Sequence, residues 1–244
     1  MSIARFVPNA FTMANLFSGV VGVYFAANGK LEIAAYAVMI GIFFDFFDGF
    51  FARLFKVQGE LGLQLDSLAD VVTSGVVPGM VMFQLIRRVD HWGQQYHGLD
   101  PDFTWETLDV LPFFGFAITL ASAFRLAKFN IDTRQGDSFI GLPTPANALL
   151  VISLPLIMAY QDIAFAEAII ENKWVLLGLT ALSCYLLNAE IPLFALKFKN
   201  WAFAKNKTRY LFLILAVALL ILLKFAAIPV IILLYVLLSL FAKK

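Results

Sequence analysis

The sequence predicts an all-α integral membrane protein with about eight transmembrane helices, arranged as a six-helix bundle followed by two C-terminal helices. Hydrophobic residues make up 61% of the 244 residues, and charged residues make up only 14%, against about 25% in a typical soluble domain. The apolar residues form long continuous runs, which are typical of membrane-spanning helices and not of strands with alternating polarity. A soluble protein of this composition would expose more apolar surface than folded monomers tolerate, so the soluble classes are excluded.

Each predicted span rests on an apolar run close to the roughly 20 residues that a helix needs to cross about 30 Å of hydrocarbon. The runs cover residues 10–28, 31–55, 63–88, 110–130, 144–161, 174–196, 208–224 and 226–242. The last two together exceed the length of one span, so we expect a tight hairpin around Lys224–Pro229. We therefore divide the chain into a membrane domain of about six spans, residues 1–196, and a basic cytoplasmic loop with a two-helix extension, residues 197–244.

The basic residues set the expected orientation, because cytoplasmic loops of membrane proteins are enriched in lysine and arginine. With both termini in the cytoplasm, thirteen of the eighteen basic residues fall on that side: Arg5, Arg53, Lys56, Arg125, Lys128, Arg134, Lys197, Lys199, Lys205, Lys207, Arg209, Lys243 and Lys244. We therefore predict a multi-pass protein of the cytoplasmic (inner) membrane. The formal net charge is only +1, so no basic patch for a nucleic acid is indicated.

Four aspartates break the apolar pattern of the second and third predicted spans. Asp45 and Asp48 are three residues apart, and Asp66 and Asp70 are four apart, so each pair lies on one face of its helix. An aspartate that faces lipid at a helix centre costs about 3 kcal/mol on insertion scales. A short segment near Lys56–Leu61 joins the two helices, which makes them antiparallel neighbours. We therefore expect the four carboxylates to meet in one pocket on the cytoplasmic side.

This cluster predicts a divalent-cation site that serves phosphoryl chemistry. Neighbouring carboxylates repel one another unless cations compensate them, and ions such as Mg²⁺ or Mn²⁺ prefer oxygen ligands. Two such ions would stabilise the attacking and leaving oxygens of an in-line displacement at phosphorus. Gly49 and Ala52 share the face of the first aspartate pair, where small side chains allow a ligand to approach the helix. Arg53 follows one turn after Gly49 and offers a bidentate donor for a phosphate.

The aspartates and the small residues form one continuous motif. It reads Asp45-x2-Asp48-Gly49-x2-Ala52-Arg53-x8-Gly62-x3-Asp66-x3-Asp70. At every fixed position this motif resembles the signature of the CDP-alcohol phosphotransferase family. Members of that family are integral membrane enzymes, commonly homodimers, that transfer a phosphatidyl or phosphoalcohol group from a CDP-linked donor to an alcohol and release CMP. The resemblance therefore implies that the first six spans form the catalytic bundle and that a pair of Mg²⁺ or Mn²⁺ ions is bound.

Further segments resemble the branch of the family that uses CDP-diacylglycerol as the donor and L-serine as the acceptor. They are Pro8–Asn15, Asp66–Pro78, Arg125–Asn130 and Gly141–Pro145. The last three spans resemble this branch in hydropathy only. The resemblance implies a membrane lipid enzyme that produces phosphatidylserine and CMP, with its active site on the cytoplasmic side.

The resemblance also implies roles for individual residues. Asp45, Asp48 and Asp66 would ligate the metal pair. Asp70 would contribute to the second metal and act as the general base for the acceptor hydroxyl. The residues that would hold CDP-diacylglycerol are Asn9, Thr12, Gly49, Ala52 and Arg53. Gly59 and Glu60 stand where some relatives use a hydroxyl residue toward the nucleotide, which puts this one contact in doubt.

A second group, Arg125, Lys128 and Asn130, lies at the cytoplasmic end of the fourth predicted span. A charge inside a span usually marks a site, so Arg125 is a candidate for binding the acceptor carboxylate or a donor phosphate. For Lys128, a place at the membrane interface explains the charge equally well.

Some alternatives stay open. The same chemistry with choline, glycerol 3-phosphate or inositol phosphate as the acceptor is the main one. An aspartyl intermediate is an alternative to direct transfer. A transporter or cation channel is disfavoured, because the sequence shows no inverted repeat and that function leaves the spacing of Gly49, Ala52 and Arg53 unexplained.

Overall fold

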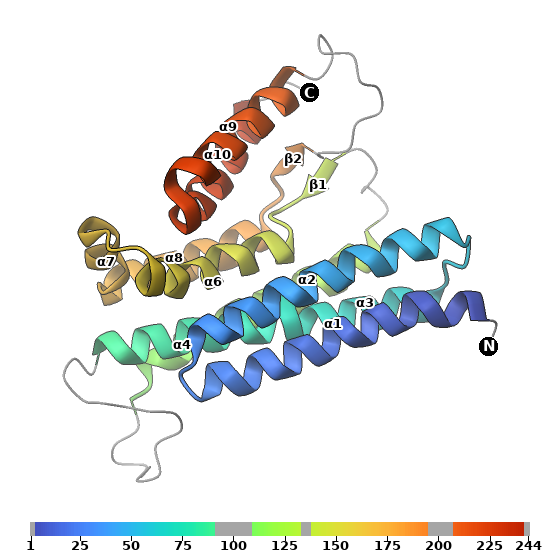
Figure 1. Ribbon diagram of the computed structural model, residues 1–244, viewed down its shortest axis with the longest axis horizontal. Helices are drawn as coiled ribbons and strands as arrows, with labels where there is room; N and C mark the ends of the chain where they lie inside the picture. Colours follow the sequence, from blue (N-terminus) through green and yellow to red (C-terminus); the bar gives the residue numbers. More distant parts are fainter. Residues whose placement is uncertain (1–2, 91–108, 133–137, 195–206, 242–244) are drawn as a thin grey trace.

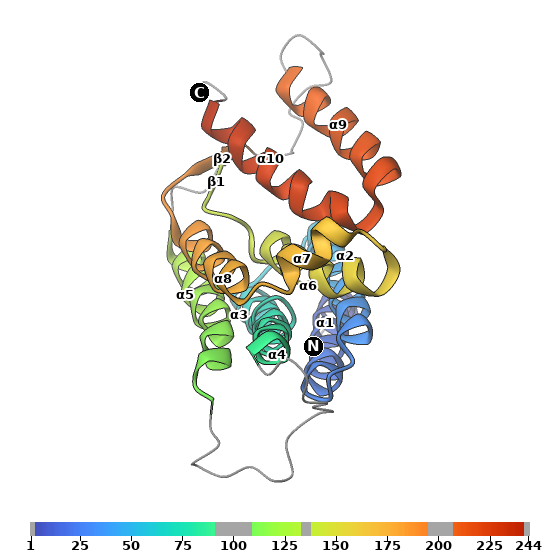
Figure 2. The same ribbon diagram turned by 90° about the vertical axis from the view of Figure 1, so that its left-hand side faces the viewer.

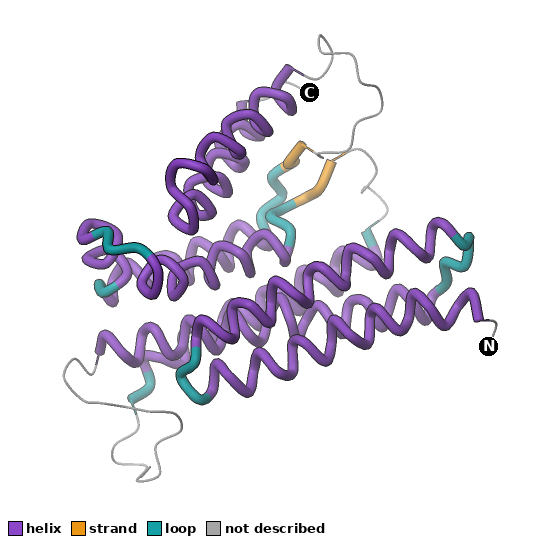
Figure 3. Tube along the Cα trace, in the orientation of Figure 1, coloured by secondary structure: helices purple, strands orange, loops and turns teal. Residues whose placement is uncertain are grey.

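The structure is a computed structural model that describes residues 3–90, 109–132, 138–194 and 207–241. Within these ranges the chain is almost entirely helical, which confirms the predicted all-α class (Figure 1, Figure 3). The one sheet among the described residues is a two-stranded antiparallel ribbon of β1 (Ser138–Ile140) and β2 (Pro192–Phe194). This short ribbon was not among the predicted elements.

The first two helices, α1 (Ile3–Ala27) and α2 (Leu31–Leu54), form a long antiparallel pair. Gly29 adopts φ +72° in the tight turn between them, a conformation that favours glycine. At 1.5 Å per residue α2 is about 36 Å long, so it exceeds the hydrocarbon core of a bilayer. Its last turns therefore reach the membrane surface, where the chain turns back into α3.

The third apolar stretch is the centre of the bundle. It consists of α3 (Glu60–Asp70), the π-helical segment η1 (Val71–Val76) and α4 (Val77–Asp90). Figure 2 shows α4 between α1 and α5, with α6 next to it. Its apolar side chains are among the most buried of the protein, Met82 and Ile86 being fully enclosed. Because most of α4 is buried, it fixes the position of the preceding helix α3, which carries Asp66 and Asp70.

The second half of the described chain covers one side of these helices. Its elements are η3 (Leu111–Phe116), α5 (Ala117–Ile131), α6 (Thr144–Tyr160), α7 (Ala164–Ile170) and α8 (Lys173–Asn188). The helix predicted over residues 174–196 ends at Asn188, which is a correction. The backbone of Ala189 is extended (ψ 141°), and the apolar residues that follow pair with β1.

The last two helices form the predicted hairpin. They are α9 (Lys207–Leu223) and α10 (Ala227–Phe241), joined by the 3₁₀ turn η5 (Lys224–Ala226). Lys224 adopts φ +49°, which breaks the long apolar stretch near the expected position. Gln161, at the end of α6, holds this turn through its side-chain amide. Its Nε2 donates to the carbonyl of Leu223 at 2.9 Å, and its Oε1 accepts from the N–H of Ala226 at 2.9 Å.

Membrane-spanning potential is clear for most of the predicted segments. Within the part of the chain that the structure describes, five stretches are long and apolar enough to cross a membrane, namely Phe6–Ala27, Leu31–Leu54, Glu60–Val89, Leu111–Ile131 and Arg209–Leu240. The last of these contains the hairpin break, and α6 and α8 are shorter apolar helices. An integral membrane protein is therefore confirmed, whereas the exact count of eight spans and the side of each terminus stay predictions.

Candidate active site

Helices α2 and α3 bring three of the four aspartates to one point. A ligand oxygen of Asp45, Asp48 and Asp66 lies within 4.8 Å of each of the other two. Asp70 sits one turn farther along α3, and its carboxyl group is close enough to that of Asp45 to share a hydrogen bond. Asp48 and Asp70 are buried, with 7% and 8% of their surface exposed. The antiparallel arrangement of the two helices thus produces the convergence that the spacing predicted.

Helix α1 supplies hydrogen bonds that orient two of these carboxylates. The hydroxyl of Thr12 donates to Oδ2 of Asp48 at 2.7 Å, and the amide of Asn15 donates from Nδ2 to Oδ1 of Asp70 at 3.2 Å. Thr73 in η1 donates in turn from its hydroxyl to the backbone carbonyl of Asn15 at 3.1 Å. Because all of these groups are buried, each bond limits the rotation of a carboxylate that would otherwise have several rotamers.

Aromatic stacking fixes α1 against α2 at the same level. The ring of Phe11 stacks on the rings of Phe51 and Phe47, with centroid distances of 5.1 Å and 5.9 Å. Phe11 directly precedes Thr12 in the chain, so the stack sets the height and rotation at which Thr12 meets Asp48. Packing and polar contacts therefore act on the same pair of helices.

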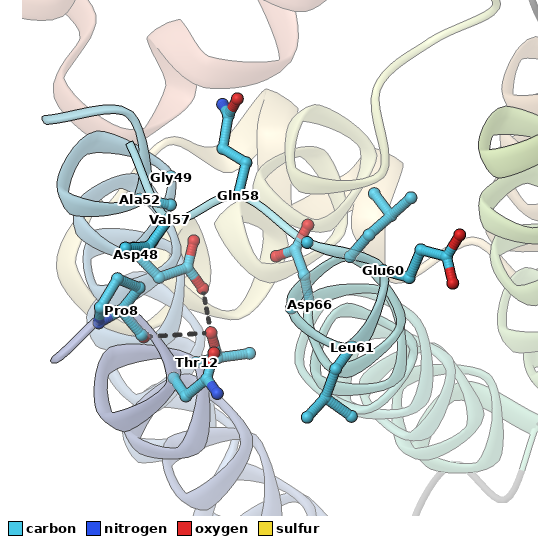
Figure 4. A pocket seen from close by; sticks show the side chains of 14 residues that line it. Pro8, Thr12, Asp48, Gly49, Ala52, Val57, Gln58, Glu60, Leu61 and Asp66 are labelled. Carbon is cyan, nitrogen blue, oxygen red and sulfur yellow. Dashed lines mark hydrogen bonds between the residues drawn. The ribbon is translucent and has the colours of Figure 1, made fainter. Parts of the chain in front are cut away.

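A pocket of about 640 Å³ opens beside the aspartates (Figure 4). Its lining comes from α1, from the end of α2, and from the connection into α3, and it includes Asn9, Thr12, Asp48, Gly49, Ala52, Gly59, Glu60, Gly62 and Asp66. Figure 4 shows the side chains of Asp48 and Asp66 on opposite walls, with Thr12 bonded to Asp48 and Glu60 directed away from them. Of the five residues expected to hold the CDP-linked donor, four line this pocket and Arg53 does not.

Arg53 lies next to the pocket instead of in its wall. A Cβ atom added at Gly49 would lie 3.3 Å from Nη1 of Arg53, its nearest neighbour. The guanidinium therefore folds back along α2 over Gly49, as expected from the spacing of one turn. Asn9 and Thr12 both belong to the helix α1.

Three predicted residues of α5 have different surroundings. Arg125 is buried, with 7% of its surface exposed, and it is close enough to Asp70 for their charges to attract. Lys128 forms an ion pair with Glu190 at 3.2 Å. Asn130 donates from Nδ2 to the hydroxyl of Ser67 at 2.8 Å and so holds α5 against α3, beside Asp66. Of the three, Arg125 interacts with Asp70 and Asn130 is bonded next to Asp66, whereas Lys128 is paired with Glu190.

Sequence reasoning missed two residues of the site, Asn15 and Thr73. Asn15 follows Thr12 by three residues and shares its helix face, so a polar pair in an apolar run was the available signal. Thr73 had no such signal, because its bond is made to a backbone carbonyl of another helix.

The chemistry of the donor set fits a divalent cation. Three carboxylates converge from two helices, and Oδ1 of Asp66 is buried without a hydrogen-bond partner. Buried carboxylate oxygens of this kind are stabilised by hard cations such as Mg²⁺ or Mn²⁺. The cluster is therefore able to bind such a cation.

Several known proteins are similar to this chain. Two relatives are CDP-diacylglycerol–serine O-phosphatidyltransferases. The one from Helicobacter pylori is 33% identical over 147 residues (59% of this chain, 55% of the relative), and the one from Bacillus subtilis is 29% identical over 154 residues (62% and 75%). An archaetidylserine synthase from Methanothermobacter thermautotrophicus is 28% identical over 163 residues (66% and 62%). The chain thus spans about half the length of the Helicobacter relative.

A sequence profile of the family described as CDP-alcohol phosphatidyltransferase matches residues 5–186. This range contains all four aspartates, the pocket and Arg125, and it ends within α8. Because more than half of the chain is matched, the protein belongs to the CDP-alcohol phosphatidyltransferase family.

Proposed function

We propose that the protein transfers the phosphatidyl group of CDP-diacylglycerol to the hydroxyl of L-serine, giving phosphatidylserine and CMP. The observation that carries this proposal is the aspartate cluster at the wall of a 640 Å³ pocket in a chain of this family. The names of the relatives, which act on CDP-diacylglycerol and serine or make archaetidylserine, support the choice of substrates.

The pocket would hold the cytidine diphosphate part of the donor. Gly49 and Ala52 present no bulky side chain on its wall, so a pyrophosphate is able to approach the helix backbone there. Arg53, folded along α2 beside Gly49, offers N–H donors to a phosphate oxygen. Asn9 and Thr12 of α1 also line the pocket, and Thr12 is bonded to Asp48.

Asp45, Asp48 and Asp66 would hold the divalent cations, with Asp70 as a further ligand of the second one. When bound, these cations neutralise phosphate charge and stabilise the leaving CMP. Thr12 is a positioning residue here, because its 2.7 Å bond fixes the carboxylate of Asp48.

The displacement itself requires a base. The serine hydroxyl oxygen bonds to the phosphorus that carries diacylglycerol, the bond from that phosphorus to the bridging oxygen breaks, and CMP leaves with the bonding electrons. The hydroxyl proton goes to Asp70, whose orientation is set by the amide of Asn15. Direct transfer fits the absence of a positioned serine, cysteine or histidine nucleophile among the described residues that line the pocket.

The site would face the cytoplasm. Arg53 and Lys56 lie in and just after the last turn of α2, at the α2–α3 connection, and Lys128 lies in the last turn of α5. The positive-inside rule expects such basic residues on the cytoplasmic side. Lys30 and Arg88 lie toward the other end of the bundle, near the α1–α2 turn and the end of α4. A homodimer, which the family resemblance implies, stays a prediction.

The first experiment compares acceptors in membranes that contain the protein. CMP release from CDP-diacylglycerol is measured with L-serine, glycerol 3-phosphate, inositol phosphate or choline. We expect release to require serine, to stop with a chelator and to return with Mg²⁺ or Mn²⁺. Release that depends on another acceptor and ignores serine would contradict the proposed substrate.

A second experiment tests the base. Asp70→Asn removes the proton acceptor but keeps the shape of the side chain, so we expect kcat to fall by about 100-fold or more while the protein still folds. Asp162→Asn, an exposed aspartate in the α6–α7 connection, is the matched control and should leave kcat unchanged. Near-normal turnover of Asp70→Asn would refute the role of Asp70.

A further inference from the structure

Three helical segments next to Asp70 bury polar groups that have no hydrogen-bond partner. Ser74 in η1, Ser122 in α5, and Thr144 and Asn147 in α6 are each at most 1% exposed. The hydroxyls of Ser74, Ser122 and Thr144, both amide atoms of Asn147, and Nε of the buried Arg125 lack partners. We call these five residues the polar set. Buried polar groups without partners cost free energy of folding, and a bound ligand that supplies the missing hydrogen bonds removes that cost.

The segments that carry the polar set are neighbours. The Cβ of Ser122 lies 3.2 Å from the position that a Cβ atom would occupy at Gly75. Ser122 therefore packs directly on η1. Ser122 and Arg125 are three residues apart on one face of α5, and Thr144 and Asn147 have the same spacing in the first turn of α6. Helix α6 contacts both η1 and α5. The residues of the polar set therefore come from the three contacting segments, η1, α5 and α6, that form one junction.

Asp70 connects this junction with the pocket of Figure 4. On one side Asp70 accepts a hydrogen bond from the side-chain amide of Asn15 in α1, and other residues of α1 line that pocket. On the other side its charge attracts that of Arg125. A base in this place has the pocket for the CDP-linked donor on one flank and the polar set on the other, where an acceptor belongs.

The chemistry of the polar set selects the class of acceptor. Asn147 has both a free donor and a free acceptor, and the hydroxyls are able to act as either. Among the described residues of η1, α5 and α6, the basic ones are Arg125 and Lys128, and Lys128 is paired with Glu190. One arginine matches the single negative charge of a carboxylate better than the double charge of a phosphate dianion.

We propose that the polar set binds the carboxylate and the ammonium of an amino-acid acceptor, with Arg125 on the carboxylate and Asn147 as a specificity-determining residue. This inference rests on the proposed function, because it concerns the second substrate of the same site. The first turn of α6 adds the positive end of its helix dipole near the carboxylate.

If the polar set were purely structural, the variant Asn147→Leu would have a different effect on the kinetics. If Asn147 only fills space, Asn147→Leu removes two unpaired buried groups, and the protein becomes more stable with unchanged kinetics. If Asn147 binds the acceptor, the same change keeps or raises stability but weakens serine binding. The two roles are therefore separated by the KM for serine and not by stability.

The test measures KM for serine and KM for CDP-diacylglycerol separately, by CMP release in detergent. We expect Asn147→Leu to raise the serine KM by about tenfold or more while the donor KM stays within about twofold. Ser122→Ala, which removes only one hydroxyl, should raise the serine KM in the same direction. Ser183→Ala is the matched control, because Ser183 on α8 is also fully buried with an unpartnered hydroxyl but lies outside the polar set.

The outcomes are distinguishable. A wild-type protein that ignores serine overturns the proposed function and this inference together. A wild-type protein that uses serine, with an unchanged serine KM in both Asn147→Leu and Ser122→Ala, overturns this inference alone. An equal rise of the serine KM in Ser183→Ala also overturns it, because the effect would then be general to buried hydroxyls. Thermal unfolding of each variant shows that it is folded.

Discussion

Gly41 on α2 is the position where packing and the orientation of Asp70 are most directly connected. A side chain at Gly41 would lie 2.5 Å from Cγ2 of Thr73 and 2.9 Å from Oδ1 of Asn15. Carbon atoms in contact prefer 3.5–4.0 Å, so Gly41→Ala requires a displacement of about 1 Å at the junction of α1, α2 and η1. Both residues that must move belong to the chain of hydrogen bonds that holds Asp70.

Two effects of Gly41→Ala follow from this geometry. Extra volume in a close-packed site costs about 1–3 kcal/mol of the free energy of unfolding. The displacement of Asn15 also releases the carboxylate of Asp70 from its 3.2 Å bond, and a misplacement of about 1 Å lowers a rate on the order of 100-fold. We therefore expect kcat to fall far more than the loss of stability alone would explain.

The assay combines kcat for CMP release with the midpoint of thermal unfolding in detergent. Gly178→Ala on α8 is the matched control, because no atom lies within 4 Å of the added methyl group. It should keep kcat and raise stability by up to about 1 kcal/mol, the difference in helix propensity between the two residues. If Gly41→Ala has the kcat and the midpoint of the wild type, the packing argument is wrong.

Two further predictions concern single polar side chains. Thr12→Val removes the bond to Asp48 without changing the shape of the side chain, so the Mg²⁺ or Mn²⁺ concentration for half-maximal CMP release should rise about 10- to 100-fold, whereas Thr12→Ser should stay near the wild type. Equal metal requirements in all three proteins would contradict this. Gln161→Leu leaves the carbonyl of Leu223 and the N–H of Ala226 without their partner, so stability should drop by about 1 kcal/mol while kcat is unchanged. A loss of kcat would show that the α9–α10 hairpin communicates with the aspartates.

The aspartate cluster was predictable because it depends on local periodicity. Residues three and four apart share a helix face, and a short connection forces two helices to be antiparallel, so Asp45 and Asp66 had to approach each other. The same reasoning placed Arg53 over Gly49. The hairpin between α9 and α10 followed from length alone, since one span cannot use so many apolar residues.

Other features depend on contacts between distant parts of the chain, and these the sequence could not predict. Glu190 and Pro192 interrupt the apolar run that begins near Trp174 and are a local signal that the helix ends. The pairing of the residues that follow with β1 involves a distant segment of the chain, so the ribbon shows only in three dimensions. The rotation of α1 that turns Asn15 toward Asp70 is set by packing, including the Phe11–Phe51 stack. The unpaired amide of Asn147 has no sequence signal, because asparagine in an apolar helix usually finds a partner.

The π-helical segment η1 has a consequence for the length of the chain. A π turn accommodates one more residue than an α turn, and each residue of an α-helix advances the next side chain by about 100°. Deleting one residue within Val71–Val76 would let α3 continue into α4 as a regular helix, with both halves still apolar enough to stay in the membrane. Because the π turn already absorbs this residue, α3 and α4 would keep nearly their present relative orientation, whereas the side chains within the segment would be displaced. Thr73 would then lose its position against the carbonyl of Asn15, the residue that orients Asp70, so a deletion there should lower kcat without unfolding the enzyme.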